Sequence, residues 1–225
     1  MVSLTSQTHQ LTSTSLHIGC GNDYRSGFVN LDRGDCAADV KHDLEDTPYP
    51  FPADHFSLII ANQTLEHLDI DKWPAIVAEL WRISAPNAVW EFRSPHALSD
   101  NFATDPTHRM PLTTRSFDYF DETRPLGELG QIYGFRPQLR VLTAWRVFGD
   151  RYGDDVYHRL LVVKPPAPIR PPANLPEHLY HPEPRLVARA RELAARHTLT
   201  ERAWALARDS LRRYRSGTGS GGAAG

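Results

Sequence analysis

The stretch LHIGCGNDYRSGFVNLDR, residues 16–33, decides the fold of this chain. Its first three residues predict a short buried strand, residues 19–21 a tight turn, and residues 28–31 a second strand that ends at Asp32. A turn without side chains lets the backbone approach a ligand, and a carboxylate ending the next parallel strand can accept hydrogen bonds from a ribose. The pattern therefore predicts a site for a nucleoside-containing cofactor, with a turn that binds no ligand as the alternative.

The stretch lacks two features of a dinucleotide-binding motif, and this limits which cofactor it can bind. A dinucleotide fingerprint needs a third glycine at the start of a full helix and an acidic residue about twenty positions further on. Here Tyr24 stands at the third glycine position and Asp32 comes too early. A cofactor with a ribose but no pyrophosphate fits better, and S-adenosylmethionine (SAM) is the common one.

Composition indicates an ordinary globular protein with one main domain. The chain has 225 residues, 40% of them hydrophobic, and its 27 acidic and 25 basic side chains nearly balance. This balance gives no sign of nucleic-acid binding. The two cysteines, Cys20 and Cys36, form no metal-type pair, which favours a reduced cytoplasmic setting. Residues 1–15 are polar, so we expect a flexible N-terminus rather than a secretory signal or a membrane anchor.

Further apolar runs predict the rest of an α/β sheet. Residues 37–41 and 56–61 predict two more strands. A helix with Pro74 in its first turn is expected to end at a left-handed Asn87, and residues 88–92 to return as a fifth strand. This alternation predicts a Rossmann-like, doubly wound, mostly parallel seven-stranded sheet.

The second half of the main domain, residues 16–165, departs from that rhythm. The polar stretch 94–125 is too long for an idle connection, and we interpret it as a lid or substrate loop. A short helix over residues 126–133 follows. Residues 139–147 and 156–163 then predict an antiparallel hairpin at the edge of the sheet.

The C-terminal part has a different composition. Residues 166–184 are a proline-rich linker, residues 185–215 predict two basic amphipathic helices, and residues 216–225 predict a flexible tail. The apolar stripes of the helices favour packing on the domain, or on a second copy in a homo-oligomer, over binding to a membrane or to nucleic acid.

With these pieces in order, residues 16–165 resemble the class I SAM-dependent methyltransferases, in particular the small bacterial methyltransferase-domain type. The resemblance is carried by LHIGCGN, FVNLD, the block KHDLEDTPYPFPADHFSLIIANQTLEHL and the strand pair near the end. The triplet LEH, residues 65–67, is the most family-specific of these motifs. The chain departs from the family at residues 22–23, where a third glycine is often found, and at residues 86–88, where the family usually has proline and glycine.

The resemblance implies a set of cofactor contacts. Residues 19–21 would pass under the amino-acid end of SAM and Asp32 would bind the ribose hydroxyls. Residues 43–44 would lie at the adenine, and residues 62–63 on the methionine side with residues 65–66 next to them. The implied cofactor-binding set is Gly19, Cys20, Gly21, Asn22, Asp32, Asp43, Leu44, Asn62, Gln63, Leu65 and Glu66.

Methyl transfer from a sulfonium needs alignment and, for an oxygen or nitrogen nucleophile, a base. The candidate catalytic residues are His67, His96 and His108, each with a purely structural role as the alternative. The spacing of His96, Asp105 and His108 matches no recognised metal-ligand motif, so no metal is expected.

The expected function is SAM-dependent methylation of an oxygen or nitrogen of a small molecule, such as a saccharide or secondary metabolite. A SAM-binding but inactive partner protein and a nucleotide-dependent oxidoreductase are the alternatives.

Overall fold

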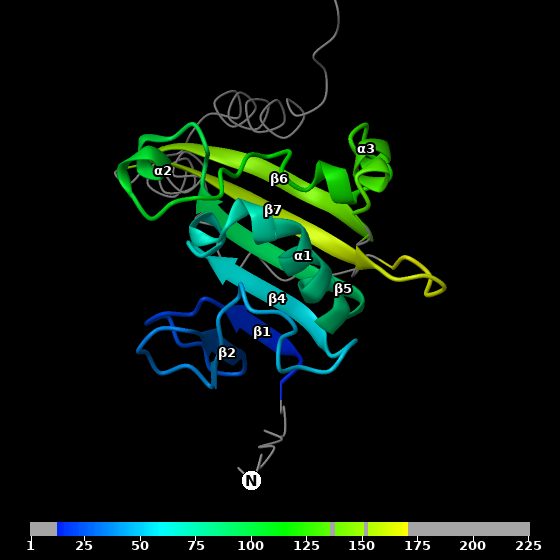
Figure 1. Ribbon diagram of the computed structural model, residues 1–225, viewed down its shortest axis with the longest axis horizontal. Coiled ribbons are helices and arrows are strands. Elements are labelled where there is room, and N and C mark those ends of the chain that lie inside the picture. The colour runs from blue at the N-terminus through cyan, green and yellow to red at the C-terminus, as the bar shows by residue number, and fades with distance from the viewer. Residues whose placement is uncertain (1–12, 136–137, 151–152, 171–225) are drawn as a thin grey trace, which may run out of the picture. The chain divides into compact units, whose positions relative to one another are not determined.

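A computed structural model describes residues 13–135, 138–150 and 153–170, and its centre is a seven-stranded sheet (Figure 1). The strand order is β3-β2-β1-β4-β5-β7-β6. Neighbours from β3 to β5 are parallel, whereas β7 is antiparallel to both β5 and β6. The predicted fold, a mostly parallel Rossmann-like sheet with an antiparallel edge hairpin, is confirmed. The strands are β1 (Ser15–Ile18), β2 (Val29–Asp32), β3 (Val40–Lys41), β4 (Phe56–Asn62), β5 (Ser84–Pro95), β6 (Gln138–Asp150) and β7 (Gly153–Val163).

The strand order reverses at β1, because the chain runs outward from β1 to β3 on one side and from β4 onward on the other. This reversal determines where a ligand can bind. Ile18, near the end of β1, is in register with Leu31 of β2 on one side and Ala61 of β4 on the other. The segments that follow all three strands therefore leave the sheet at one edge. Open parallel sheets bind ligands at such a switch point, beyond the carboxyl ends of their strands.

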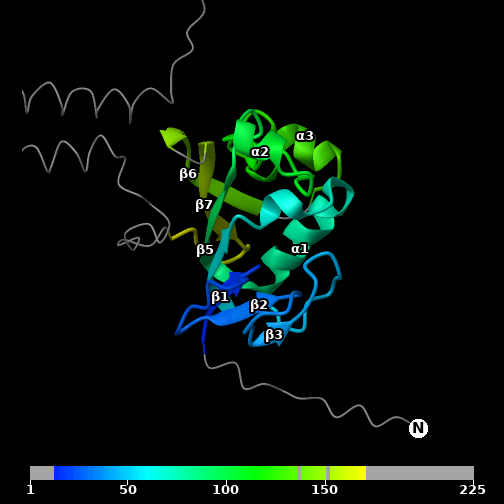
Figure 2. The same ribbon diagram turned by 90° about the vertical axis from the view of Figure 1, so that its left-hand side faces the viewer.

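The crossover from β4 to β5 is the one parallel connection that contains an α-helix. It holds the 3₁₀ turns η1 (Leu65–His67) and η2 (Ile70–Lys72) and then the helix α1 (Trp73–Ile83), with Pro74 in its first turn as predicted. Its apolar side is buried in the core, and Figure 2 shows α1 and α3 on the same side of the sheet. Turns and loops alone connect β1 to β2, β2 to β3 and β3 to β4.

The predicted boundary at Asn87 was wrong. The helix ends at Ile83, because Ser84 is extended and its hydroxyl donates to the carbonyl of Leu80 at 2.7 Å. Asn87 does have a left-handed backbone, with φ of 63°, but it lies inside β5. Its side chain binds the backbone of residues 168 and 170 beyond β7, at 3.1 and 2.8 Å, a contact that no local pattern reveals.

The segment from residue 94 to residue 125 is a packed part of the domain. It contains α2 (Asp100–Thr104) and η3 (Asp118–Phe120), and α3 (Gly127–Ile132) follows it. A hydrogen bond connects this segment to the sheet: Nε2 of His158, in β7, lies 2.8 Å from the carbonyl oxygen of Thr113. The side chains of this segment in the hydrophobic core are Met110, Leu112, Phe117 and Phe120.

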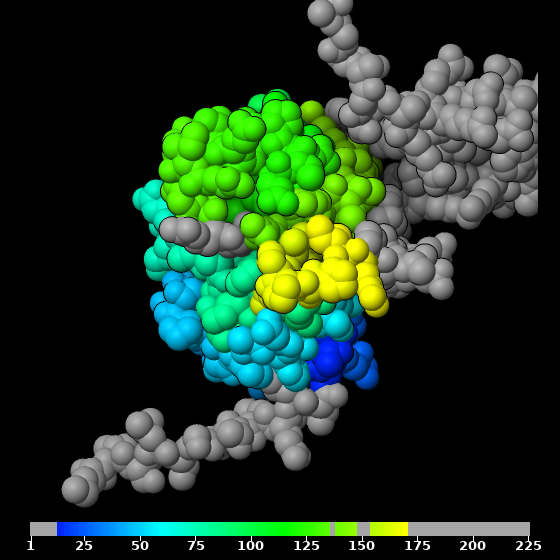
Figure 3. Space-filling view, turned by 90° about the vertical axis from the view of Figure 1, so that its right-hand side faces the viewer, coloured from blue at the N-terminus to red at the C-terminus, as the bar shows by residue number. Residues whose placement is uncertain are grey.

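The residues just after β7 pack against the domain. The Lys164 ammonium pairs with Asp54 and lies 4.3 Å from the centre of the Trp81 ring. Figure 3 shows the chain that follows β7, in yellow, on the surface of the domain. Most of the predicted flexible N-terminus and linker, and all of the helices predicted over residues 185–215 and the tail 216–225, lie outside the described residues. Among the helices that the structure does describe, none is long and apolar enough to cross a membrane.

Candidate functional site

The two glycines of the turn after β1 have different neighbours. Both have left-handed backbones, with φ of 61° at Gly19 and 50° at Gly21. A Cβ at Gly19 would lie 2.1 Å from Cγ2 of Thr64, whereas a Cβ at Gly21 would meet nothing within 4 Å. Gly19 is therefore required by the packing of the turn against the segment after β4. Gly21 leaves an open surface where a ligand can approach the backbone.

The carboxylate of Asp32 is fixed beside this turn by two backbone groups. Its Oδ2 accepts a hydrogen bond from Gly21 N at 2.8 Å, and its Oδ1 accepts one from Gly34 N at 2.6 Å. Each carboxylate oxygen has a further lone pair, and the side chain is only partly buried. Asp32 can therefore accept hydrogen bonds from a pair of hydroxyls without losing the contacts that orient it.

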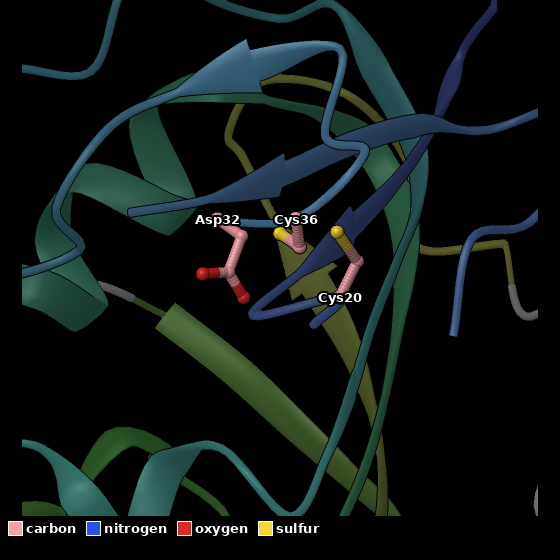
Figure 4. A group of neighbouring side chains, drawn as sticks. All are labelled: Cys20, Asp32 and Cys36. Atoms are coloured by element: carbon pink, nitrogen blue, oxygen red, sulfur yellow. The ribbon is translucent and has the colours of Figure 1, made fainter. Parts of the chain in front are cut away.

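Two cysteines lie next to Asp32. Figure 4 shows the side chains of Cys20, Cys36 and Asp32 gathered in one place, and their thiols and the Asp32 carboxylate come within 4.8 Å of one another. Burial, with the neighbouring Cys36 and Asp32 contributing, raises the pKa of the Cys20 thiol to about 12. Cys20 is therefore a neutral thiol at physiological pH.

The residues implied at the adenine lie beyond β3. Burial alone would raise the pKa of Asp43, but the hydrogen bond from Glu45 N and the Arg33 guanidinium lower it overall. Leu44 is buried in the core, and Asn22 is exposed at the other end of the site. The cofactor contacts expected of Asp43, Leu44 and Asn22 stay predictions.

The residues implied on the methionine side follow β4. Asn62 Oδ1 is a buried acceptor without a hydrogen-bond partner. Gln63 has a left-handed backbone, with φ of 52°, and its amide nitrogen lies 3.3 Å from a carboxylate oxygen of Asp155 in β7. The side chain of Gln63 thus reaches towards the antiparallel hairpin.

Leu65 and Glu66 are both fully buried, but they differ in chemistry. Leu65 belongs to the hydrophobic core. Glu66 has no hydrogen-bond partner at either carboxylate oxygen, and burial raises its pKa to about 7. Its backbone carbonyl accepts hydrogen bonds from the nitrogens of Arg109 and Met110, at 2.7 and 2.9 Å. This contact brings the segment that carries His108 to the end of β4.

Two of the three candidate histidines meet at this point. The ring centres of His67 and His108 lie 4.8 Å apart, and one ligand atom from each comes within 4.8 Å of a Glu66 carboxylate oxygen. We call Glu66, His67 and His108 the histidine cluster. Burial and the neighbouring His108 lower the pKa of His67, which favours its neutral form.

His96 is placed differently from the other two. It is buried at the end of β5, and its Nδ1 accepts a hydrogen bond from Leu98 N at 3.1 Å. Burial, together with the charge of Arg146, lowers its pKa. Within the described chain His96 belongs to no cluster of possible ligands.

Sequence reasoning missed two threonines at this edge. Thr64 packs against Gly19 and donates a hydrogen bond to the Gly19 carbonyl at 3.2 Å. Thr107 lies 3.0 Å from His67 Nδ1, and both its hydroxyl and its backbone nitrogen bind Asp105 Oδ1. The Asp-Pro-Thr sequence at residues 105–107 is a turn signal that would have indicated the second one.

The strand order agrees with the fold expected from the resemblance to class I methyltransferases. No protein-family model matches the chain, and no curated protein matches it. Among solved structures, a SAM-dependent methyltransferase from Archaeoglobus fulgidus aligns with a TM-score of 0.42 and 15% identity, over 65% of this chain and 85% of that chain.

Two further solved structures align with the domain to a similar extent. The N-methyltransferase NodS from Bradyrhizobium japonicum WM9 has a TM-score of 0.46 and 16% identity, over 68% of this chain and 86% of that chain. The [4+2]-cyclase SpnF has a TM-score of 0.44 and 13% identity, over 66% and 74%.

Proposed function

We propose that this chain binds SAM and transfers its methyl group to an oxygen or nitrogen of a small-molecule acceptor. The observation that carries the proposal is the Asp32 carboxylate, held against the open backbone of Gly21 at the switch point of the sheet. This arrangement offers acceptors for a ribose diol and a bare backbone for the rest of the cofactor.

The connection between β1 and β2 favours SAM over a dinucleotide. A pyrophosphate is normally bound by the N-terminus of a helix that follows the glycine turn. Here residues 19–28 form turns without a helix, and Tyr24 is exposed at the position of the third glycine. The protein therefore lacks the helix N-terminus that would bind the pyrophosphate of a nicotinamide dinucleotide. This absence disfavours the oxidoreductase alternative.

The histidine cluster supports catalysis over cofactor storage. It follows β4, and Thr64 connects the start of its turn directly to Gly19. An acceptor bound there would lie beside the cofactor turn, where its nucleophile can be aligned and activated. We expect the acceptor to be a saccharide or secondary metabolite and the enzyme to act in the cytoplasm, as a homo-oligomer if the C-terminal helices pair.

Cofactor binding is tested by calorimetry with S-adenosylhomocysteine on the full chain. A hydrogen bond to a charged group contributes about 1.5–3 kcal/mol, so Asp32→Ala should weaken binding roughly ten- to a hundredfold. The matched control is Asp71→Ala, because Asp71 is exposed on η2. Equal affinities of parent and Asp32→Ala, or tighter binding of NADH than of S-adenosylhomocysteine, would overturn the proposal.

Turnover separates an enzyme from an inactive binder. Parent protein and Asp32→Ala are incubated with SAM and a panel of hydroxylated and amino-bearing small molecules, and release of S-adenosylhomocysteine is measured. Turnover that requires an acceptor and is lost in the variant supports the methyltransferase.

A further inference from the structure

Glu66 is the starting point, because its carboxylate is in an unusual position. The side chain is completely buried, and neither carboxylate oxygen has a donor in good hydrogen-bond geometry, although the Ser94 hydroxyl lies beside them. The guanidinium of Arg93 acts on Glu66 only through its charge, because it is bound to Asp155 at 2.8 Å. A buried carboxylate without a partner is costly, and buried charges in proteins are normally paired or bound to a metal.

The two histidines present their remaining nitrogens as ligands. The Thr107 hydroxyl donates to Asp105 Oδ1 at 2.6 Å, so it accepts from Nδ1–H of His67 at 3.0 Å. The Phe102 carbonyl can only accept, so Nδ1 of His108, 3.0 Å away, carries a proton as well. From these partners we assign a proton to Nδ1 of both rings, so that Nε2 is the nitrogen that can face a ligand. Metal-binding histidines are usually oriented in this way.

We propose that Glu66, His67 and His108 bind one divalent transition-metal ion. Their ligand atoms lie within 4.8 Å of one another. Ligands about 2.1 Å from a tetrahedral ion are roughly 3.4 Å apart, so small side-chain rotations complete the site. Two imidazoles and one carboxylate suit Zn²⁺, Co²⁺ or Fe²⁺ better than Mg²⁺ or Ca²⁺, which prefer oxygen ligands. Three protein ligands leave at least one position open.

The charges around the cluster suit a cation. A bound cation would offset the cost of burying the Glu66 carboxylate, which the charge of the nearby Arg93 offsets only in part. The Asp105 carboxylate lies 3.7 Å from Nε2 of His108 and adds negative charge at the open side. No Lys or Arg side chain among the described residues forms an ion pair with Glu66.

The open position gives the ion a role in the proposed reaction, and this step rests on the proposed function. An acceptor hydroxyl bound to the ion would lose its proton more easily, because a divalent cation lowers the pKa of a bound oxygen. The acceptor class is then a small molecule that presents a metal-binding hydroxyl. Metal binding itself is independent of SAM, so each proposal can fail alone.

Co²⁺ is the probe, because its spectrum reports its ligands. Tag-free full-length protein, freed of metal by a chelator, is titrated with Co²⁺ by calorimetry and visible absorption. We expect one ion per chain with weak d–d bands. Glu66→Gln and His108→Ala should each weaken binding by more than about a hundredfold, since changing a residue that only orients a ligand costs about 10- to 100-fold. Matched controls are Glu128→Gln, on the exposed face of α3, and His55→Ala, at the opposite end of β4.

Thr107 is a positioning residue, and it provides a variant that leaves all three ligands in place. Thr107→Val removes the hydroxyl that holds His67 Nδ1 and should weaken Co²⁺ binding about 10- to 100-fold. Thr107→Ser should restore it. A role of Thr107 in loop stability alone would lower the melting temperature without changing the d–d bands.

Three results would overturn the proposal. They are no Co²⁺ binding to the folded parent, unchanged binding in both Glu66→Gln and His108→Ala, and an intense thiolate-to-cobalt charge-transfer band. The last would place the ion at Cys20 and Cys36 instead. If S-adenosylhomocysteine still binds in any of these cases, the methyltransferase proposal survives.

Discussion

The glycine turn of residues 19–21 and the histidine cluster lie at the same edge of the sheet, yet they are built in opposite ways. The turn is completed by its own surroundings, because Asp32 binds Gly21 and Gly34 and Thr64 fills the space beside Gly19. The cluster keeps a fully buried carboxylate without a partner. If the two proposed sites are right, the turn is preformed for its cofactor, whereas the cluster is completed only by a bound ion.

The largest effect should appear in turnover, at His108. His108→Ala removes a group at the proposed acceptor position, and positioned groups of this kind typically contribute 10²- to 10⁴-fold. We expect turnover to fall by that factor while the affinity for S-adenosylhomocysteine stays within about twofold. Steady-state kinetics with an acceptor from the panel, together with calorimetry, measure both quantities.

His55→Ala is the control for this experiment and should keep full activity. A parallel loss of cofactor affinity in His108→Ala would show that the turn and the cluster are one energetic unit. That result would contradict separate roles for the turn and the histidine cluster.

The two glycines offer the next largest effect, in stability. Gly19→Val places a branched side chain in a left-handed backbone and against Thr64, which should cost about 2–5 kcal/mol of unfolding free energy. Gly21→Ala has open space and should cost only about 1–2 kcal/mol. Urea denaturation monitored by circular dichroism measures the difference.

For cofactor affinity, the open position of Gly21 should matter more than its small effect on stability suggests. Gly21→Ala should be folded and bind S-adenosylhomocysteine poorly, because its new methyl group occupies the open approach. Normal binding by folded Gly21→Ala would move the ligand away from this turn.

The smallest expected effect is a pH dependence at His158. This fully buried side chain has its pKa lowered to about 4 by desolvation, from about 6.5 in the unfolded chain. The folded state therefore binds this proton less readily, so its contribution is complete above about pH 6.5 and is lost as the pH falls towards 4. The shift corresponds to about 3 kcal/mol.

Because His158 fastens Thr113 to β7, acid should loosen the segment that carries His108 before it disturbs the glycine turn. Urea unfolding of the parent and of His158→Gln between pH 7.5 and pH 4.5 tests this. The glutamine can still donate to the Thr113 carbonyl but does not titrate in this range, so the variant should show a shallower decline. Identical slopes would exclude His158 as the source.

The sequence predicted the turn better than the cluster, for a physical reason. Residues 16–33 form a local motif whose strands, glycines and Asp32 lie within eighteen residues, so their spacing alone predicts that Asp32 lies beside the turn, as it does. His67 and His108 are 41 positions apart, and a hydrogen bond from Arg109 N to the Glu66 carbonyl brings them together. No periodicity encodes that contact.

The left-handed backbone of Asn87 was predicted correctly, but its place in the fold was not. Asn87 is left-handed as predicted, but contacts with residues 168 and 170 put that conformation inside β5 instead of at a helix end. The expected roles of Asp43, Gln63 and Leu65 stay predictions, since they depend on a bound cofactor.

The burial of Glu66 has a consequence for anyone who engineers this protein. An unsatisfied buried carboxylate lowers stability by about 1–3 kcal/mol, so replacing it with a neutral or apolar residue of similar size should raise the melting temperature. A screen for heat resistance would therefore enrich substitutions at position 66 and select for well-folded variants that lack the proposed metal ligand. Libraries meant to improve this scaffold should keep residue 66 fixed.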